Sequence, residues 1–447
     1  MKYFYYVAFS LLIYSCSSIE IVEESSPELT QINENTKFKN FLDSEWDKSL
    51  NENPLFASYV GDKRNNNKIN SNSIEQFNNE KQSNIESLSN LKKIDISKLS
   101  DENVLNYKLY EFGVRRNIDL ANFPTYFLRI NQRGGIQSFY ETGNRLVYTN
   151  SQDYYDWLSR LVQFSENIEI FLEINKKGLL QGVTQPKMIT QSVITQIDKI
   201  INSDIDKNPY MKVFLEADET LISISEKTNL INDAQQLILN KIIPAYIDLN
   251  NFLKDEYLPN SRDSIGISDV PGGKVYYEYL TQFYTTTDLT PDQIHQIGLD
   301  EIKRIRTEME EIIQQVNWNG DFNSFLNYLR TNPRFYYDNP NDLFNAYLIM
   351  SKTIDPLLPK IFKVFPRAPY GVIPIPEESA PFTTTAYYNS PSPGRPGYFY
   401  ANLYKPESRP KYEIPVLTVH EAVPGHHFQI SIAQELENVP EFRKYQG

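Results

Sequence analysis

Residues 151–178 read SQDYYDWLSRLVQFSENIEIFLEINKKG and are patterned as one long amphipathic helix. Apolar residues that recur three and four positions apart fall on one face of a helix. We predict that Ser151 caps this helix, that it ends near Gly178, and that its apolar face packs into the core rather than against a cofactor. The apolar positions are Tyr154, Trp157, Leu161, Phe164, Ile168 and Phe171.

Three more helices are predicted downstream. One runs from about Asp233 to Tyr257 and is kinked at Pro244, since proline removes a backbone donor. Another follows Thr290-Pro291-Asp292, where threonine suits the N-cap and proline the first helical position. A further helix covers Asp342 to Phe362. The fold is therefore predicted to be mainly α.

A proline-rich stretch interrupts this helical pattern, with eleven of the 26 prolines lying between Pro366 and Pro415. Within it, the aromatic run Tyr398 to Tyr404 is the best candidate for a strand. Such a strand could be a sheet edge on which an extended peptide pairs, or part of a hairpin that covers the core. On the first alternative, Tyr400 and Asn402 are candidates for a substrate cleft.

Three of the four histidines lie in one short window, His420-Glu421-Ala422-Val423-Pro424-Gly425-His426-His427. Imidazole is a common zinc ligand, and a glutamate beside a ligand can serve as general base for an attacking water. We therefore predict a zinc site with Glu421 as the base; manganese and cobalt remain open. The alternative is a structural histidine cluster.

The spacing of these histidines does not suit an unbroken helix. A regular helix would place His426 about 240° around the axis from His420, and His427 roughly 10.5 Å further along it. Pro424-Gly425 can break the helix and form a bulge, so we predict that the pair loops out and returns a second histidine to His420. His426 is the first choice for that ligand and His427 the second.

These residues resemble the signature of a bacterial family known as domain of unknown function 885, DUF885. The likeness covers the chain from about residue 40 to its end. It is carried by His420–Gln429 and by four further segments, Val270–Gly273 with Tyr276-Tyr277, Thr285–Pro291 with His295 and Gly298, Pro356–Pro376, and Tyr387-Tyr388 through Asn402.

The resemblance implies a large multi-helix domain similar to the gluzincin oligopeptidases, with a glutamate from a later helix as third ligand. That glutamate belongs to an E-G-W-like block, which is expected beyond Gly447, so the chain looks C-terminally truncated and catalysis is expected to need the missing block. Glu435 and Glu437 are weak substitutes, more typical of solvated helix charges. The resemblance also includes His295, which either shapes the cleft or is an ordinary helix residue. Gln429 is a candidate for orienting a ligand.

The N-terminus has the plan of a bacterial secretory signal. An uncharged run follows Lys2, and Cys16, the single cysteine, follows Ser15 as in a lipoprotein box. We predict a signal segment over 1–16 with lipid attachment at Cys16, a flexible tether over 17–36, and one helical domain over 37–447. The protein would be lipid-anchored in the cell envelope, periplasmic or at the cell surface. A plain cleaved signal is the alternative.

Composition narrows the function classes. A net charge of −13 and a pI of about 5.0 argue against nucleic-acid binding. We predict a zinc-dependent hydrolase, acting on peptides because the implied relatives do. The competing class is a non-catalytic surface lipoprotein that binds a peptide or another ligand, and hydrolysis of a non-peptide amide or ester is a third possibility. The oligomeric state stays open.

Overall fold

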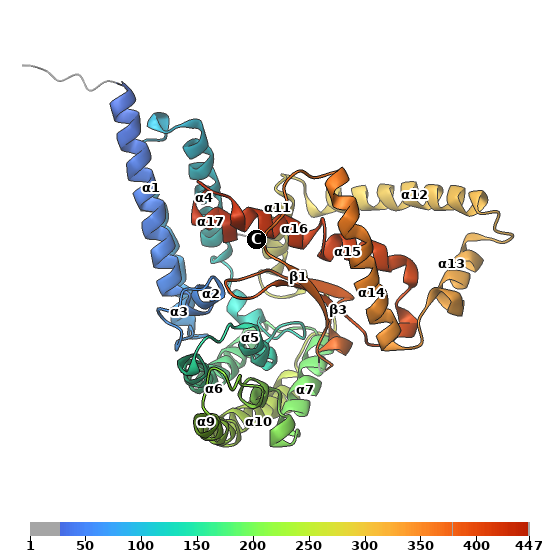
Figure 1. The fold of residues 1–447 in the computed structure, drawn as a ribbon, viewed down its shortest axis with the longest axis horizontal. Coiled ribbons are helices and arrows are strands. Elements are labelled where there is room, and N and C mark those ends of the chain that lie inside the picture. Colours follow the sequence, from blue (N-terminus) through green and yellow to red (C-terminus); the bar gives the residue numbers. More distant parts are fainter. Residues whose placement is uncertain (1–26, 378, 446–447) are drawn as a thin grey trace, which may run out of the picture.

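The computed structural model describes residues 27–377 and 379–445, and most of that part of the chain is helical. The prediction of a mainly α fold with a small β segment is confirmed. None of the described helices is both long and apolar enough to cross a membrane. Figure 1 shows a lower helical bundle, a small central sheet, a helical hairpin projecting on one side and a helical arm on the other.

The projecting hairpin is built by the N-terminal helices, which enclose a core of their own around Phe38, Leu91 and Tyr107. α1 starts at Pro27, so residues 27–36 of the predicted tether are helical. The polar residues of this segment dock the helix, since the Glu34 carboxylate accepts from the Asp95 backbone N–H at 2.7 Å. The elements are α1 (Pro27–Glu52), α2 (Pro54–Tyr59), α3 (Ile74–Leu91) and α4 (Asp101–Leu120).

The lower bundle contains the largest core, centred on α6. Its predicted apolar face is buried as expected, but the cap is Asn150, whose side chain accepts from the Asp153 N–H. Two π-helical turns flank α10, and the first of them leads directly into Pro244. The bundle elements are α5 (Tyr140–Arg145), α6 (Ser151–Leu180), α7 (Lys187–Ile201), α8 (Lys212–Leu215), α9 (Ile224–Leu237) and α10 (Ile243–Phe252).

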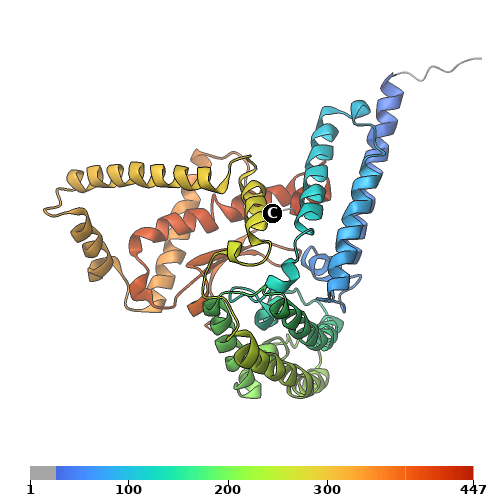
Figure 2. The ribbon, with the colours of Figure 1, turned by 180° about the vertical axis from the view of Figure 1, so that it is seen from behind.

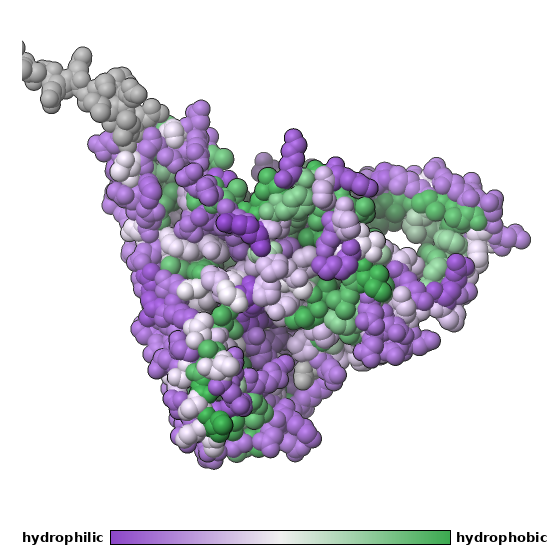
Figure 3. Space-filling view, in the orientation of Figure 1, coloured by the Kyte–Doolittle hydropathy of each residue, from purple (hydrophilic) through white to green (hydrophobic). Residues whose placement is uncertain are grey.

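The arm extends away from the α1–α4 hairpin in both ribbon views (Figures 1 and 2). Its long helix begins as predicted, with Thr290 and Gln293 forming a reciprocal capping box. Apolar side chains including Ile297 and Ile302 stay exposed along it, and Figure 3 shows apolar residues on the arm. The arm consists of α12 (Pro291–Gln315) and α13 (Phe322–Thr331). The helix before it, α11 (Gly273–Thr285), packs on α4, where the Tyr279 hydroxyl donates to the Arg116 carbonyl at 3.0 Å.

The central sheet packs against the helices that carry the histidines. The predicted helix over 342–362 is α14, which ends at Ile354 because a 3-10 turn containing Pro356 and Pro359 follows. The other elements are β1 (Tyr370–Pro374), β2 (Ala386–Asn389), β3 (Gly397–Ala401), α14 (Pro340–Ile354), α15 (Ile414–Glu421), α16 (His426–Glu435) and α17 (Glu441–Tyr445).

The predicted strand is the middle one of three. The order is β1-β3-β2, with β1 parallel and β2 antiparallel to β3. Both sides of β3 are therefore already paired, so the expectation that it forms a sheet edge for a peptide is wrong.

The two faces of the sheet contact different parts of the molecule. Successive side chains of a strand point to opposite faces. On one face, Tyr387 stacks on Tyr400 with ring centroids 4.7 Å apart. On the other, Phe399 packs against Tyr347 of α14, and Tyr388 reaches α16. The sheet thus separates the lower bundle from the histidine helices.

Candidate functional site

α15 delivers His420 and Glu421 to the site. Ile414, Thr418 and Ala422 bury one side of this short segment, and the Thr418 hydroxyl donates to the Ile414 carbonyl at 2.7 Å. The helix ends at Glu421, and the chain then passes through a cis Val423-Pro424 peptide before α16 begins. The predicted interruption by Pro424-Gly425 is present.

The interruption returns His426 to His420. Their ring centroids lie 4.7 Å apart, with the ring planes at 87°. Gly425 makes this approach possible, because a Cβ at that position would lie 1.9 Å from the His420 carbonyl oxygen. The His426 side chain is 44% exposed, so the pair of imidazoles is open to solvent on that side.

Glu421 lies behind the two imidazoles. Its side chain is only 9% exposed, and its Oε2 is 3.9 Å from Nε2 of His426. This oxygen is buried and has no hydrogen-bond partner among the described residues. Burial raises the pKa of Glu421, although the neighbouring His426 and His420 oppose the shift. A carboxyl with a raised pKa that faces two imidazoles is suited to accept a proton.

His427 does not face His420 as His426 does. It is buried, and its Nδ1 lies 2.8 Å from the Tyr388 hydroxyl and 3.2 Å from the Ser431 hydroxyl. Burial lowers the pKa of His427, which favours the neutral imidazole. Gly397 of β3 packs against this pair, since a Cβ there would lie 2.1 Å from the Tyr388 hydroxyl. His427 therefore ties the start of α16 to β2, while His426 faces His420.

A zinc ion can be tested against these side chains. Two imidazoles that meet, with an unpartnered carboxylate oxygen beside them, fit two ligands and a base. Across the residues that the structure describes, no group of three His, Cys, Asp or Glu is arranged to hold a metal. The donor set fits zinc in kind, with two of the three or four protein ligands such a site needs.

The remaining predicted residues lie in different places. Asn402 is fully buried, and its amide donates to the carbonyls of Ala380 and Thr384 at 2.8 and 2.9 Å, so it holds a loop rather than facing a cleft. His295 is exposed on the first turns of α12. Gln429 is exposed on α16, with no side-chain bond to a histidine in the described chain. Cys16 lies outside the described residues.

Glu435 has a role that sequence reasoning missed. Its carboxylate accepts from the backbone N–H groups of Arg367 and Ala368 at 2.7 and 3.0 Å, and from the Arg367 guanidinium at 3.1 Å. It therefore ties the end of α16 to the chain entering β1. The partners lie 67 and 68 residues away, and no local pattern points to them. Tyr388, the partner of His427, lies in a segment that carries the family resemblance, but its sequence position alone indicates no role.

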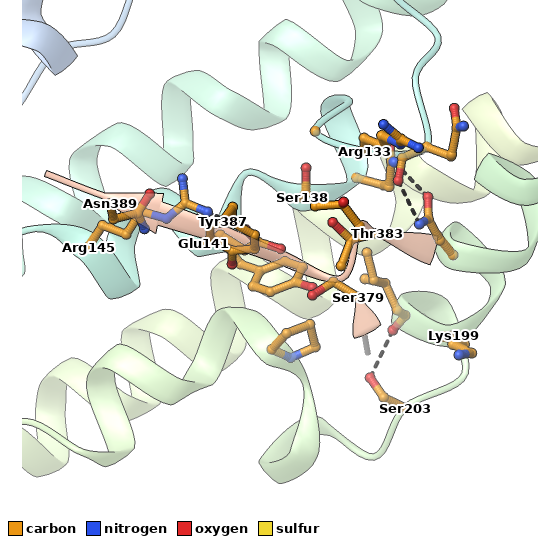
Figure 4. A pocket seen from close by; sticks show the side chains of 18 of the residues that line it. Arg133, Ser138, Glu141, Arg145, Lys199, Ser203, Ser379, Thr383, Tyr387 and Asn389 are labelled. Carbon is orange, nitrogen blue, oxygen red and sulfur yellow. Dashed lines mark hydrogen bonds and ion pairs between the residues drawn. The ribbon is translucent and has the colours of Figure 1, made fainter. Parts of the chain in front are cut away.

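The other face of the sheet borders a cavity of about 350 Å³. Figure 4 shows its lining, which comes from the segment 132–145, the end of α7, the segment 203–209 that follows it, the loop 379–384 and β2. Tyr387 points into it from β2, and burial raises the pKa of Tyr387. Tyr400 lies behind Tyr387 in the stacked pair, so this predicted cleft residue supports the wall of the cavity.

Solved structures share this fold, among them two candidate lipoproteins. The crystal structure of a candidate lipoprotein from Colwellia psychrerythraea has a TM-score of 0.76 at 23% identity, covering 94% of this chain and 75% of its own. A candidate lipoprotein of unknown function from Shewanella oneidensis has a TM-score of 0.59 at 16% identity, covering 91% of this chain and 74% of its own.

Comparison with curated proteins gives no match. The model of a bacterial protein family of unknown function, DUF885, matches residues 54–447, which confirms the resemblance. The match includes His420, Glu421 and His426. The chain belongs to the DUF885 family.

Proposed function

We propose that this protein is a zinc-dependent hydrolase, acting on peptides, with His420 and His426 as metal ligands and Glu421 as general base. The observation that carries the proposal is the meeting of the two imidazoles beside the buried, unpartnered Oε2 of Glu421. A buried oxygen without a partner costs about 1–3 kcal/mol, a cost that a functional site can accept.

Each side chain of the proposed site has a separate role. When bound, zinc supplies a Lewis acid that polarises a carbonyl and makes water more acidic. Glu421 takes the proton from the attacking water on Oε2 and returns it to the leaving amine nitrogen. His427, through Tyr388, fixes the start of α16 and so orients His426. The third ligand, a glutamate, is a prediction that rests on the family resemblance.

Glu421→Gln tests the base directly. The substitution keeps the shape and removes the proton acceptor, so zinc content should stay unchanged while turnover falls by about 10²-fold or more. The measurement is metal-dependent appearance of new termini when full-length protein is incubated with a mixed peptide library. Glu437→Gln, which removes an exposed carboxylate from the same segment, is the matched control. Unchanged turnover in Glu421→Gln would rule out the role of the base.

A lipid-anchored location is part of the proposal. This location is supported by the sequence like a lipoprotein box that ends at Cys16 and by the fold shared with two candidate lipoproteins. Cys16→Ser should lose both incorporation of labelled fatty acid and the membrane-bound fraction in cells. Retention of both in the variant would contradict lipid attachment at Cys16.

A non-catalytic ligand-binding lipoprotein is the second candidate. The observation favouring it is the cavity between the sheet and the lower bundle, which is large enough for a small molecule. The peptide-library measurement separates the two candidates, because a binder yields no new termini.

A further inference from the structure

The described residues that line the cavity beside Tyr387 carry a net charge opposite in sign to that of the whole chain. The chain as a whole carries a net charge of −13. Yet among the described residues that line the cavity, four are cations, Arg133, Arg145, Lys199 and Lys207, and one is a carboxylate, Glu141. A concave surface lined by one sign of charge concentrates ligands of the opposite sign.

Among the described residues, two of these cations are paired with a carboxylate and two are not. Arg145 is paired with Glu141 at 2.6 Å, and Lys207 with Asp204 at 3.2 Å. Arg133 and Lys199 have no carboxylate partner in the described parts of the chain, and the ammonium of Lys199 lies 5.1 Å from the centre of the Phe382 ring. Their charge is therefore available to a bound anion.

The cavity also contains polar groups that lack partners. Gln137 is 3% exposed, and its Nε2 donates to the Asn131 carbonyl and to Oε1 of Gln196. Because a carbonyl can only accept, the orientation of this amide is fixed, and its Oε1 is left buried without a donor among the described residues. Nδ2 of Asn389 is likewise buried, with no partner in the described chain. Buried polar groups are usually paired, so each of these two lining residues keeps a polar atom that the described chain does not satisfy.

The labelled side chains lie along an elongated space in Figure 4. Arg133 and Lys199 lie towards one side, while Arg145 and Asn389 lie towards the other, with Tyr387 and Glu141 between them. Hydroxyl groups of Ser138, Ser203, Ser379 and Thr383 also border it. On their side of the view Arg133 lies above and Lys199 below, so the arrangement suits a molecule with an anionic group near either cation and hydrogen-bonding groups along its length.

We propose that this cavity binds a small organic anion, in which a carboxylate or phosphate meets Arg133 or Lys199 and hydroxyl or amide groups meet Gln137 and Asn389. A volume of about 350 Å³ is at the lower end of small-molecule sites. The site lies on the opposite face of the sheet from His420 and His426, and it is independent of the proposed hydrolase activity.

Calorimetric titration of full-length protein, without added metal, tests the proposal. The probes are three anions with matched neutral partners: N-acetylglutamate with N-acetylglutamine methylamide, glucuronate with methyl glucoside, and glycerol 3-phosphate with glycerol. At least one anion should bind saturably and about tenfold or more tightly than its neutral partner, and added salt should weaken it. Comparison of the two carboxylate probes with the phosphate probe identifies which anionic group is preferred.

Variants place the binding in this cavity. Arg133→Ala combined with Lys199→Ala should weaken the preferred anion by about tenfold or more, because charge-assisted bonds are lost. Lys303→Ala combined with Arg330→Ala removes the same charge from exposed positions elsewhere and should leave the affinity unchanged. If no anion exceeds its neutral partner, or if both double variants behave alike, the proposal is wrong.

Asn389→Leu separates binding from folding. The substitution removes the unpartnered donor and keeps a similar volume, so the free protein should be as stable as the wild type or more so. The preferred anion should nevertheless bind several-fold more weakly. Full affinity in this variant would remove Asn389 from the site, and a fall in stability would show that its amide is needed by the fold instead.

Discussion

Gly425 determines how closely the two candidate ligands approach. An added side chain at this position would need space that the backbone of α15 already occupies. The space is taken by the His420 carbonyl, 1.9 Å from an ideal Cβ, and by the Val419 carbonyl at 2.4 Å. Backbone atoms cannot move aside as a flexible side chain can.

Gly425→Ala should therefore separate His420 from His426. We expect it to lower the free energy of unfolding by about 1–3 kcal/mol and to weaken zinc binding. Denaturant unfolding and zinc titration are the measurements. Gly298→Ala is the control, because nothing lies within 4 Å of its Cβ in α12, and it should stabilise the helix by about 0.5–1 kcal/mol. Equal zinc affinity in both variants would contradict the account of the loop.

At the residue scale, the sequence could predict the loop but not the direction of each histidine. Pro424-Gly425 and the six-residue interval are local signals, and they identify the interruption. The burial of His427 depends on Tyr388, which is distant in the sequence and reaches it only through the sheet. The unpartnered Oε2 of Glu421 is likewise a result of packing that no spacing reveals.

At the element scale, the end of α16 is held by the contacts of the charged Glu435 carboxylate. Burial by itself raises the pKa of Glu435, but hydrogen bonds from the Ala368 backbone and from the Arg367 side chain and backbone outweigh it and lower the pKa. A carboxylate whose pKa is lower in the folded state adds stability above its unfolded pKa. That stability is lost as the pH falls through the folded pKa.

Glu435→Gln should accordingly cost about 1–3 kcal/mol at neutral pH and lose less stability than the wild type on acidification below pH ~4.3. Denaturant unfolding at a series of pH values measures both effects. Glu437→Gln, at an exposed position two residues further on, should follow the wild-type profile. A Glu435→Gln profile parallel to that of the wild type would contradict this role.

Elements that neighbouring residues specify could be predicted from the sequence. The distant elements with which they pack or pair could not. The Thr290 capping box and the apolar face of α6 come from neighbouring residues, and both are confirmed. Asn150 replaced Ser151 as cap because either side chain can accept the same kind of bond. The central position of β3 depends on β1, which precedes it by more than twenty residues, and sequence alone gave no sign of that parallel pairing.

At the scale of the whole molecule, the last described helix joins distant parts of the chain. Phe442 of α17 packs edge-on against Tyr110 of α4, with ring centroids 5.4 Å apart. Tyr445 stacks on Trp46 of α1 at 5.6 Å, and Arg443 donates to the Asn106 side chain at 3.0 Å. The segment that follows the histidines is thus anchored on the N-terminal hairpin.

Phe442→Ala should loosen this anchor. We expect a loss of about 1–3 kcal/mol and faster hydrogen exchange in α1 and α4 than in α6, which has a core of its own. Exchange measured by mass spectrometry on both regions is the test. Leu180→Ala, at a position that is 89% exposed, should change neither region. Uniform acceleration across the protein would contradict local anchoring.

Metal content tests the central claim most directly. Elemental analysis of full-length protein supplied with zinc should find about one zinc per chain, lost in His420→Ala and in His426→Ala. His295→Ala, which removes an exposed histidine on α12, should keep its zinc. Stoichiometric zinc that survives both His420→Ala and His426→Ala, or no stoichiometric metal in the wild type, would contradict the proposed site.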